Sequence, residues 1–155
     1  MHIHKYERYW MTFGIGMLIV FLITLSVAAF AQGINPPTDT KPVDPTKITS
    51  TPPFDHPGLR ALPDGNYEAY YVARVFAFDP ATLTVPVGKK VTFYLTSADV
   101  VHGYYIPETD VNMMAVPGWV NTISHTFTKK GTYLLICHEY CGIGHQNMFA
   151  KIEVQ

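Results

Sequence analysis

Two thiols, two imidazoles and a thioether lie close together near the C-terminal end of the chain. The stretch 137–148 reads CHEYCGIGHQNM and contains both cysteines, two of the seven histidines and one of the six methionines. A further imidazole, His102, stands 35 residues before Cys137 in the sequence. Thiolate, imidazole and thioether groups suit copper, zinc or iron–sulfur chemistry and not magnesium or calcium. The spacing therefore indicates a site for a soft metal ion.

Several kinds of site could use these side chains. A mononuclear blue-copper site needs one Cys, two His and a weak Met, and it would leave one cysteine idle. A binuclear copper site uses both thiolates as bridges, His102 and His145 as terminal ligands, and Met148 with a backbone carbonyl as weak axial ligands. We favour copper. A tetrahedral zinc site and a Cys137–Cys141 disulfide remain alternatives, although a disulfide would leave His145 and Met148 unexplained.

The elements that must position these residues are short strands. From Asn66 onward, runs of strand-forming residues alternate with turn residues, which predicts a β-sandwich with Greek-key connections. A redox-active CxxxC motif on a thioredoxin-like fold would need helices after the cysteines, and the pattern predicts none. The cysteines lie in the loop between the last two predicted strands. The predicted strands are residues 67–78, 82–87, 90–97, 100–106, 111–116, 122–128, 132–137 and 148–154.

The N-terminal part predicts one transmembrane helix. Residues 11–31 carry no charge, and a helix of that length spans roughly 30 Å, the thickness of the hydrocarbon core. Lys5 and Arg8 precede it, and no further cation follows before Lys41. The positive-inside rule therefore predicts a cytoplasmic N-terminus and a C-terminal domain on the periplasmic side of the cell membrane. A cleaved signal peptide is the alternative, because Ala29-Phe30-Ala31 is similar to a cleavage site, but the apolar run exceeds the usual length.

Composition separates the remaining parts of the chain. The 155 residues carry a net charge of −1, and without a basic excess nucleic acid is not an expected partner. Eight of the twelve prolines fall within residues 33–65, which predicts an extended linker. The expected organisation is an N-terminal segment with its helix in residues 1–32, a linker in residues 33–65, and a metal-binding domain in residues 66–155.

The motifs VHGYYI and CHEYCGIGHQNM resemble those of subunit II of haem–copper cytochrome c oxidases. The sequence GHQNMF, with a single membrane helix, is most similar to the B-type (ba-type) oxidases. The resemblance implies an all-β cupredoxin domain that holds the mixed-valence binuclear copper centre called CuA. By this resemblance the copper ligands are His102, Cys137, the Glu139 carbonyl oxygen, Cys141, His145 and Met148.

The same resemblance implies a function for the chain within an oxidoreductase. The centre would accept electrons from a cytochrome c and pass them to a haem of subunit I, where oxygen is reduced to water and protons are pumped. The expected partners are subunit I, cytochrome c and membrane lipid. Two other classes fit less well: a copper-delivery protein would have a more open site, and a copper-free quinol oxidase subunit would lack these ligands.

Four residues have a second interpretation beside the one that the resemblance implies. Glu139 could help bind magnesium at the interface with subunit I, or be an exposed side chain. Phe76 and Phe78 resemble positions for electron uptake, or are ordinary core residues. Glu7 could admit protons to subunit I, or be a solvated acid that is favourable at a helix N-terminus. His138 is expected to point away from the metals.

Overall fold

The computed structural model describes residues 4–32 and 38–155. The chain forms two compact units, Met1–Ile34 and Asn35–Gln155, and each is treated by itself below.

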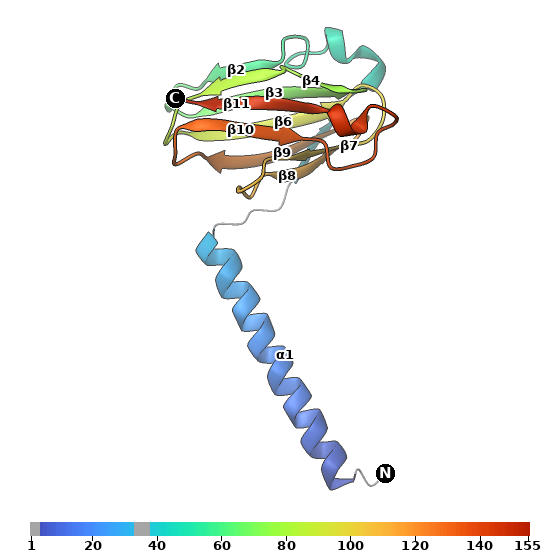
Figure 1. Cartoon of the computed structure of the whole chain (residues 1–155), viewed down its shortest axis with the longest axis vertical. Coiled ribbons are helices and arrows are strands. Elements are labelled where there is room, and N and C mark those ends of the chain that lie inside the picture. Colours follow the sequence, from blue (N-terminus) through green and yellow to red (C-terminus); the bar gives the residue numbers. More distant parts are fainter. Residues whose placement is uncertain (1–3, 33–37) are drawn as a thin grey trace. The chain divides into compact units, whose positions relative to one another are not determined.

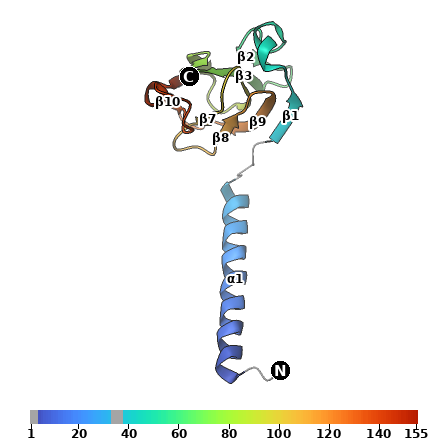
Figure 2. The same ribbon diagram turned by 90° about the vertical axis from the view of Figure 1, so that its right-hand side faces the viewer.

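The first unit is a single helix, α1 (Lys5–Gln32), which is drawn as one continuous coil in Figures 1 and 2. Its 28 residues correspond to about 42 Å at 1.5 Å per residue. Among the described residues it is the one helix that is long and apolar enough to cross a membrane, with a mean hydropathy of 2.5. The hydroxyls of Thr12 and Thr24 donate to carbonyls four residues earlier, both at 2.8 Å. These polar groups are therefore satisfied inside the helix, and the predicted N-terminal apolar helix is confirmed.

The second unit is a two-sheet β-sandwich, most of whose strands are labelled in Figure 1. Neighbouring strands are antiparallel except for the parallel pairs β3/β6 and β5/β11. The first sheet has the order β1 (Thr38–Pro42), β9 (Trp119–Thr126), β6 (Lys90–Ser97), β3 (Tyr67–Arg74) and β2 (Gly58–Ala61), with β4 (Ala77–Asp79) paired to β3. The second has the order β5 (Thr82–Val85), β11 (Phe149–Val154), β10 (Gly131–Ile136), β7 (His102–Tyr105) and β8 (Asn112–Ala115).

Large apolar side chains fill the space between the two sheets. Tyr71 on β3, Phe93 on β6 and Tyr104 on β7 are fully buried, and the ring of Tyr104 meets that of Tyr71 edge-on with centroids 5.3 Å apart. Burying one such side chain contributes about 1.5–3 kcal/mol. Since inward-facing residues alternate with outward-facing ones along each strand, this core also determines which residues of β7 and β10 face the inside of the sandwich.

The prediction of an extended linker over residues 33–65 is wrong for residues 38–65, which belong to the sandwich. Strand β1 pairs with β9 and β2 pairs with β3, and a 3₁₀ helix, η1 (Pro45–Ser50), lies between them. Asp44 caps η1 by accepting a hydrogen bond from the N–H of Thr46 at 3.0 Å. Ile48 and Phe54 are buried in a second apolar cluster with Tyr70 of β3. This burial outweighs the turn-forming tendency of the prolines; residues 33–37 of the predicted linker lie outside the described residues.

The predicted run 67–78 is also divided in the structure. Strand β3 ends at Arg74 and β4 begins at Ala77, and the two strands pair as a hairpin. Val75 and Phe76 form its turn and are exposed. This turn places Phe76 outside the sandwich and Phe78 inside it.

Candidate metal centre

The loop between β10 and β11 is held at both of its ends. The two strands pair in antiparallel register up to Ile136 opposite Phe149, and the N–H of Cys137 donates to the carbonyl of Met148 at 3.1 Å. A short 3₁₀ helix, η2 (His145–Asn147), closes the loop, with the N–H of Met148 donating to the carbonyl of His145 at 3.1 Å. The first and last candidate ligands of the motif therefore lie side by side. Figure 1 shows the loop between β10 and β11, in red, at one end of the sandwich.

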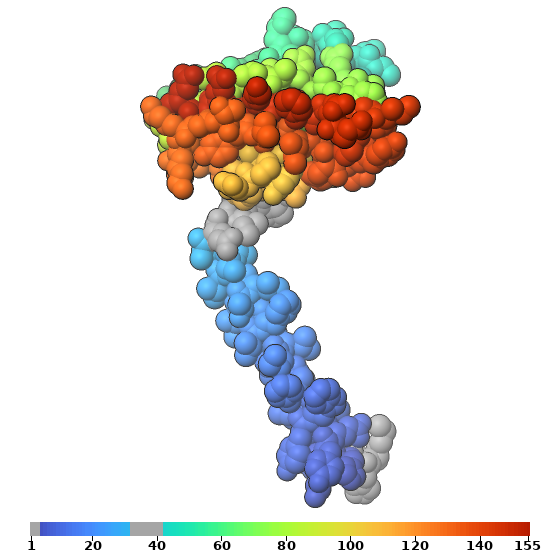
Figure 3. All heavy atoms as spheres, viewed as in Figure 1, coloured from blue at the N-terminus to red at the C-terminus, as the bar shows by residue number. Residues whose placement is uncertain are grey.

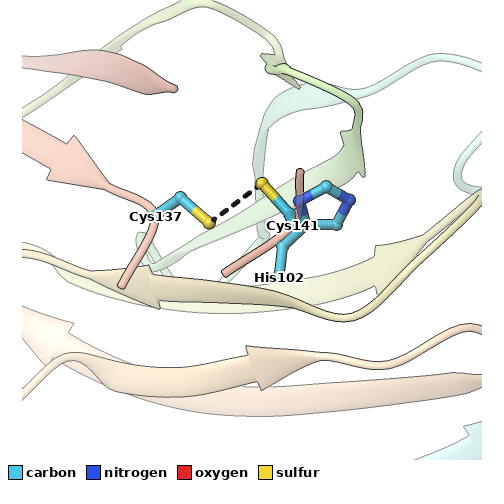
Figure 4. A group of neighbouring side chains, drawn as sticks. All are labelled: His102, Cys137 and Cys141. Carbon is cyan, nitrogen blue, oxygen red and sulfur yellow. Dashed lines mark hydrogen bonds between the residues drawn. The ribbon is translucent and has the colours of Figure 1, made fainter. Parts of the chain in front are cut away.

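His102 reaches the same end of the sandwich from β7. This strand neighbours β10, with Tyr105 opposite Ile136. His102 and Tyr104 are both fully buried on the core side of the strand. Figure 4 shows the His102 ring beside the thiol of Cys141, with the two sulfur atoms directed toward each other. Residues far apart in the sequence are thus brought together by strand pairing.

The donor atoms form one connected cluster. The sulfur atoms of Cys137 and Cys141 lie 3.8 Å apart, and the thiol of Cys137 donates to the Glu139 carbonyl oxygen at 3.2 Å. Nδ1 of His145 and Sδ of Met148 each lie 3.6 Å from the Cys141 sulfur. The ligand atoms of Cys137, Cys141 and His102 lie within 4.8 Å of one another. Both cysteines are free, so both of their sulfur atoms are available to bind a metal ion.

The carboxylate of Asp99 orients the His102 ring. Oδ1 of Asp99 accepts a hydrogen bond from Nε2 of His102 at 2.8 Å, so Nδ1 is left with its lone pair. Nδ1 is buried and has no hydrogen-bond partner among the residues that the structure describes. A buried polar atom without a partner is costly, and a metal ion would satisfy it. The residues present therefore fit a bound metal.

Asp99 is itself held in its ionised form. Partial burial acts to raise its pKa, but hydrogen bonds from His102 and from the backbone N–H groups of Val75 and Val100 outweigh burial, so the pKa lies below its usual value. The Val75 N–H donates to Oδ2 of Asp99 at 2.7 Å. One carboxylate therefore joins the β3–β4 turn to a candidate ligand. Sequence reasoning missed Asp99; the signal that could have found it is an acidic residue three positions before His102.

Burial, together with the hydrogen bond and the charge of the neighbouring Cys137 sulfur, raises the pKa of the Cys141 thiol to about 11. In the metal-free chain this thiol is therefore protonated at neutral pH. A metal ion binds the thiolate, so it must displace the proton.

The two candidate phenylalanines have different places. Phe78 is buried in the core, where its ring meets Tyr104 edge-on at 5.7 Å between centroids. Phe76 is 40% exposed and covers the backbone of Gly142 and Gly144 in the ligand loop. A Cβ added at Gly144 would lie 2.5 Å from Cδ2 of Phe76. Of the two rings, Phe76 is the one that reaches the surface beside the cluster.

The remaining candidate residues lie outside the cluster. The exposed His138 packs against Gly103, on the opposite side of β7 from the buried His102, which agrees with the expectation that it points away from the metals. The side chain of Glu139 is exposed, and only its carbonyl oxygen contacts the cluster. Glu7 is exposed in the first turn of α1.

Comparison with known proteins decides the family. Residues 64–155 match the family model described as "Cytochrome C oxidase subunit II, periplasmic domain". The chain belongs to the cytochrome c oxidase subunit II family. It is 38% identical over 154 residues to a cytochrome c oxidase subunit 2 of Thermus thermophilus, covering 97% of this chain and 92% of the relative. A second Thermus thermophilus subunit 2 is 36% identical, covering 84% of this chain and 98% of the relative. The resemblance to haem–copper oxidase subunit II is confirmed.

Solved structures agree with this family. A chain from a heme-copper terminal oxidase dimer superposes with a TM-score of 0.78 and 32% identity, covering 97% of this chain and all of the other. The periplasmic domain of subunit II of cytochrome oxidase from Bradyrhizobium japonicum superposes with a TM-score of 0.53 and 23% identity, covering 57% of this chain and 83% of the other, which shows the shared fold. The predicted cupredoxin-like sandwich is confirmed, and the chain is a component of a haem–copper oxidase.

Proposed function

We propose that the cluster is a binuclear copper centre, CuA, through which this subunit takes electrons from a cytochrome c and delivers them to a haem of subunit I. Oxygen is reduced to water there, and the reaction is coupled to proton pumping. The observation that carries the proposal is a pair of free sulfurs 3.8 Å apart with further donors on both sides.

The donor set favours copper over a structural zinc ion. A tetrahedral zinc would use four ligands and would leave the thioether of Met148, buried 3.6 Å from the Cys141 sulfur, without a role. A binuclear copper centre would use both thiolates, both imidazoles, the thioether and a backbone carbonyl as donors. The ligands would be His102, Cys137, the Glu139 carbonyl oxygen, Cys141, His145 and Met148.

When bound, two copper ions in such a site share one unpaired electron, so the charge of one transfer is spread over both metals. The protein supplies rigidity and exclusion of water. Cys137 and Met148 are tied together by a backbone hydrogen bond, and Asp99 holds His102 in one orientation. Ligands held in this way move little when the charge changes, which keeps the cost of rearrangement small.

The surface beside the cluster suits an apolar encounter with the electron donor. Val75, Phe76, Tyr140 and Ile143 are exposed there, and we assign electron uptake to the side that carries Phe76. Few charged side chains lie near the loop in the sequence. Added salt screens the attraction between exposed charges, and here there are few such charges to screen. We therefore expect turnover with cytochrome c to depend only weakly on ionic strength. A steep loss of rate with added salt would contradict this assignment.

In the same proposal α1 anchors the chain in the lipid of the cell membrane, with its N-terminus in the cytoplasm and the sandwich on the periplasmic side. The subunit is assigned to an oxidase of the B-type, on the motif GHQNMF and the single helix. The exposed Glu139 carboxylate is assigned to magnesium at the interface with subunit I. Protease digestion of sealed vesicles tests the orientation, because only the exposed side is cleaved.

Glu7 is assigned to proton uptake at the cytoplasmic start of α1, where its carboxylate is exposed in the first turn. Turnover and proton pumping of the assembled Glu7→Gln oxidase test this role. Values near those of the unaltered enzyme would reduce Glu7 to a solvated acid at a helix N-terminus.

The centre itself is tested on the full chain in detergent, loaded with copper. We expect two coppers per chain and an EPR hyperfine pattern from one electron shared by two copper nuclei. A single copper with the pattern of one nucleus would indicate a blue-copper site with an idle cysteine. Zinc binding without copper uptake would restore the structural zinc interpretation.

A further inference from the structure

The candidate ligands are almost closed off from solvent. His102 is 0% exposed, Met148 2%, Cys137 7% and Cys141 8%. His145 is only half-buried. A metal ion can therefore reach the sulfurs only through a particular opening, and the surroundings of His145 are the place to look for it.

An open groove of about 370 Å³ lies on the outer face of β10 and β11 at this point. Leu134 and Ile136 alternate with the buried Leu135 along β10, and Phe149 stands opposite Ile136 on β11, so these three side chains share the outer face. Figure 3 shows this face of the domain in orange and red. Besides the polar Gln146, the lining of the groove combines apolar side chains with candidate ligands: Leu134, Ile136, Phe149, Cys137, His145 and Met148.

The opposite side of the ligand loop is covered. The ring of Phe76 lies so close to the loop that a Cβ at Gly142 would be 3.0 Å from it and one at Gly144 2.5 Å. The neighbouring Val75 is held by its hydrogen bond to Asp99 at 2.7 Å. Phe76 therefore closes this side, while the groove beside Leu134 remains open.

We propose that metal ions enter and leave the ligand cluster through the groove between Leu134 and Phe149, with the half-buried His145 as the first ligand that an incoming ion meets. Nδ1 of His145 and Sδ of Met148 both lie 3.6 Å from the Cys141 sulfur, so an ion held by them is adjacent to the buried thiols. This route rests on the proposed metal centre. Leu134 and Phe149 would control the rate of metal exchange but not the affinity for the metal.

The test measures rates of metal binding to the full chain in detergent with its thiols reduced. Co²⁺ is the probe, because it keeps its oxidation state on binding and its thiolate complex absorbs light. In Leu134→Trp the indole should fill the groove and slow binding roughly tenfold, equivalent to about 1.4 kcal/mol of activation free energy. Removal of Co²⁺ by a chelator should slow by the same factor, because one route serves both directions. The dissociation constant should stay unchanged.

Two further variants make the result specific. Thr132→Trp places the same indole on an exposed position of the same strand, two residues farther from the ligands, and should bind at the unaltered rate. Leu134→Ala widens the groove and should bind faster, which also provides a test if the tryptophan variant fails to fold.

The outcomes separate the route from the centre. Slow exchange in Leu134→Trp with unchanged affinity, or faster exchange in Leu134→Ala, supports the route. Unchanged rates in both Leu134 variants overturn it while the metal centre stands. A chain whose Cys137 and Cys141 never bind Co²⁺ overturns the centre and the route together.

Discussion

Nε2 of the buried His102 lies 2.8 Å from Oδ1 of Asp99, and this contact decides which ring nitrogen remains free for a metal. The carboxylate can only accept, so Nε2 carries a proton, and a neutral ring then has its lone pair on Nδ1. Partners of this kind orient metal-binding histidines and tune their basicity. The surface residue Asp99 therefore acts on the cluster through His102.

Replacing Asp99 by Asn should weaken metal binding. The amide that replaces one oxygen can donate to Nε2, which would move the ring proton to Nδ1 and block the free lone pair. Loss of such a partner typically lowers metal affinity by about 10–100-fold. Competition with a chelator of known affinity measures the change. Asp79→Asn, at an exposed position at the end of β4, is the matched control, and equal affinities in the two variants would contradict the role of Asp99.

The contact between Gly144 and Phe76 predicts a pair of compensating substitutions. Gly144 has φ −92°, so its backbone would accept alanine, but the new Cβ would lie 2.5 Å from Cδ2 of Phe76. Gly144→Ala should lower the free energy of unfolding by about 1–3 kcal/mol, as overpacking usually does. Because the three nearest atoms all belong to the Phe76 ring, Phe76→Ala should restore most of the loss. Urea unfolding of the two single variants and the double variant gives the coupling energy, and purely additive losses would refute the contact.

Gly103 provides a contrasting case. A Cβ at Gly103 would lie 2.7 Å from the ring of His138 and also 2.7 Å from its backbone nitrogen. The backbone cannot rotate away, so Gly103→Ala should be destabilising by at least about 1–3 kcal/mol. His138→Ala should give little rescue, since the backbone nitrogen stays in place. Thermal unfolding of the metal-free chain measures both, and full rescue by His138→Ala would show that the side chain alone causes the clash.

Metal binding should release protons. Burial raises the pKa of Cys141 to about 11 in the metal-free chain, so its thiol is protonated at pH 7 and the proton must leave when the thiolate binds metal. Titration with Co²⁺ in buffers of different ionisation enthalpy counts the protons, and we expect at least one per chain. Affinity should rise with pH over the neutral range, and an affinity independent of pH would contradict a protonated Cys141.

The same raised pKa predicts how the stability of the metal-free chain depends on pH. The unfolded chain loses the Cys141 proton near pH 9, before the folded chain does near pH 11. The contribution of this thiol to stability is therefore fully present below about pH 9 and is lost as pH rises toward 11. Denaturant unfolding of the metal-free chain and of its Cys141→Ser variant should show a smaller alkaline loss in the variant. Identical alkaline slopes would contradict the buried thiol.

The sequence by itself determined those features that depend on neighbouring residues. The apolar run of α1 (Lys5–Gln32) was evident because crossing a membrane requires a continuous stretch. Most of the candidate ligands were evident because they share one loop, in which Cys137 and Met148 are only eleven positions apart. The predicted strands of the sandwich were mostly right, since alternation of buried and exposed residues is also local.

The tertiary structure decided what depends on distant contacts. Phe76 and Phe78 are two positions apart and would share a face in a continuous strand, but the turn between β3 and β4 leaves one exposed and buries the other. The Pro-rich residues 38–65 belong to the sandwich because β1 and β2 pair with neighbouring strands and Ile48 is buried in an apolar cluster. Backbone pairing and burial between segments that are remote in the sequence stabilise these arrangements. A local pattern of residues does not show which segments will pair.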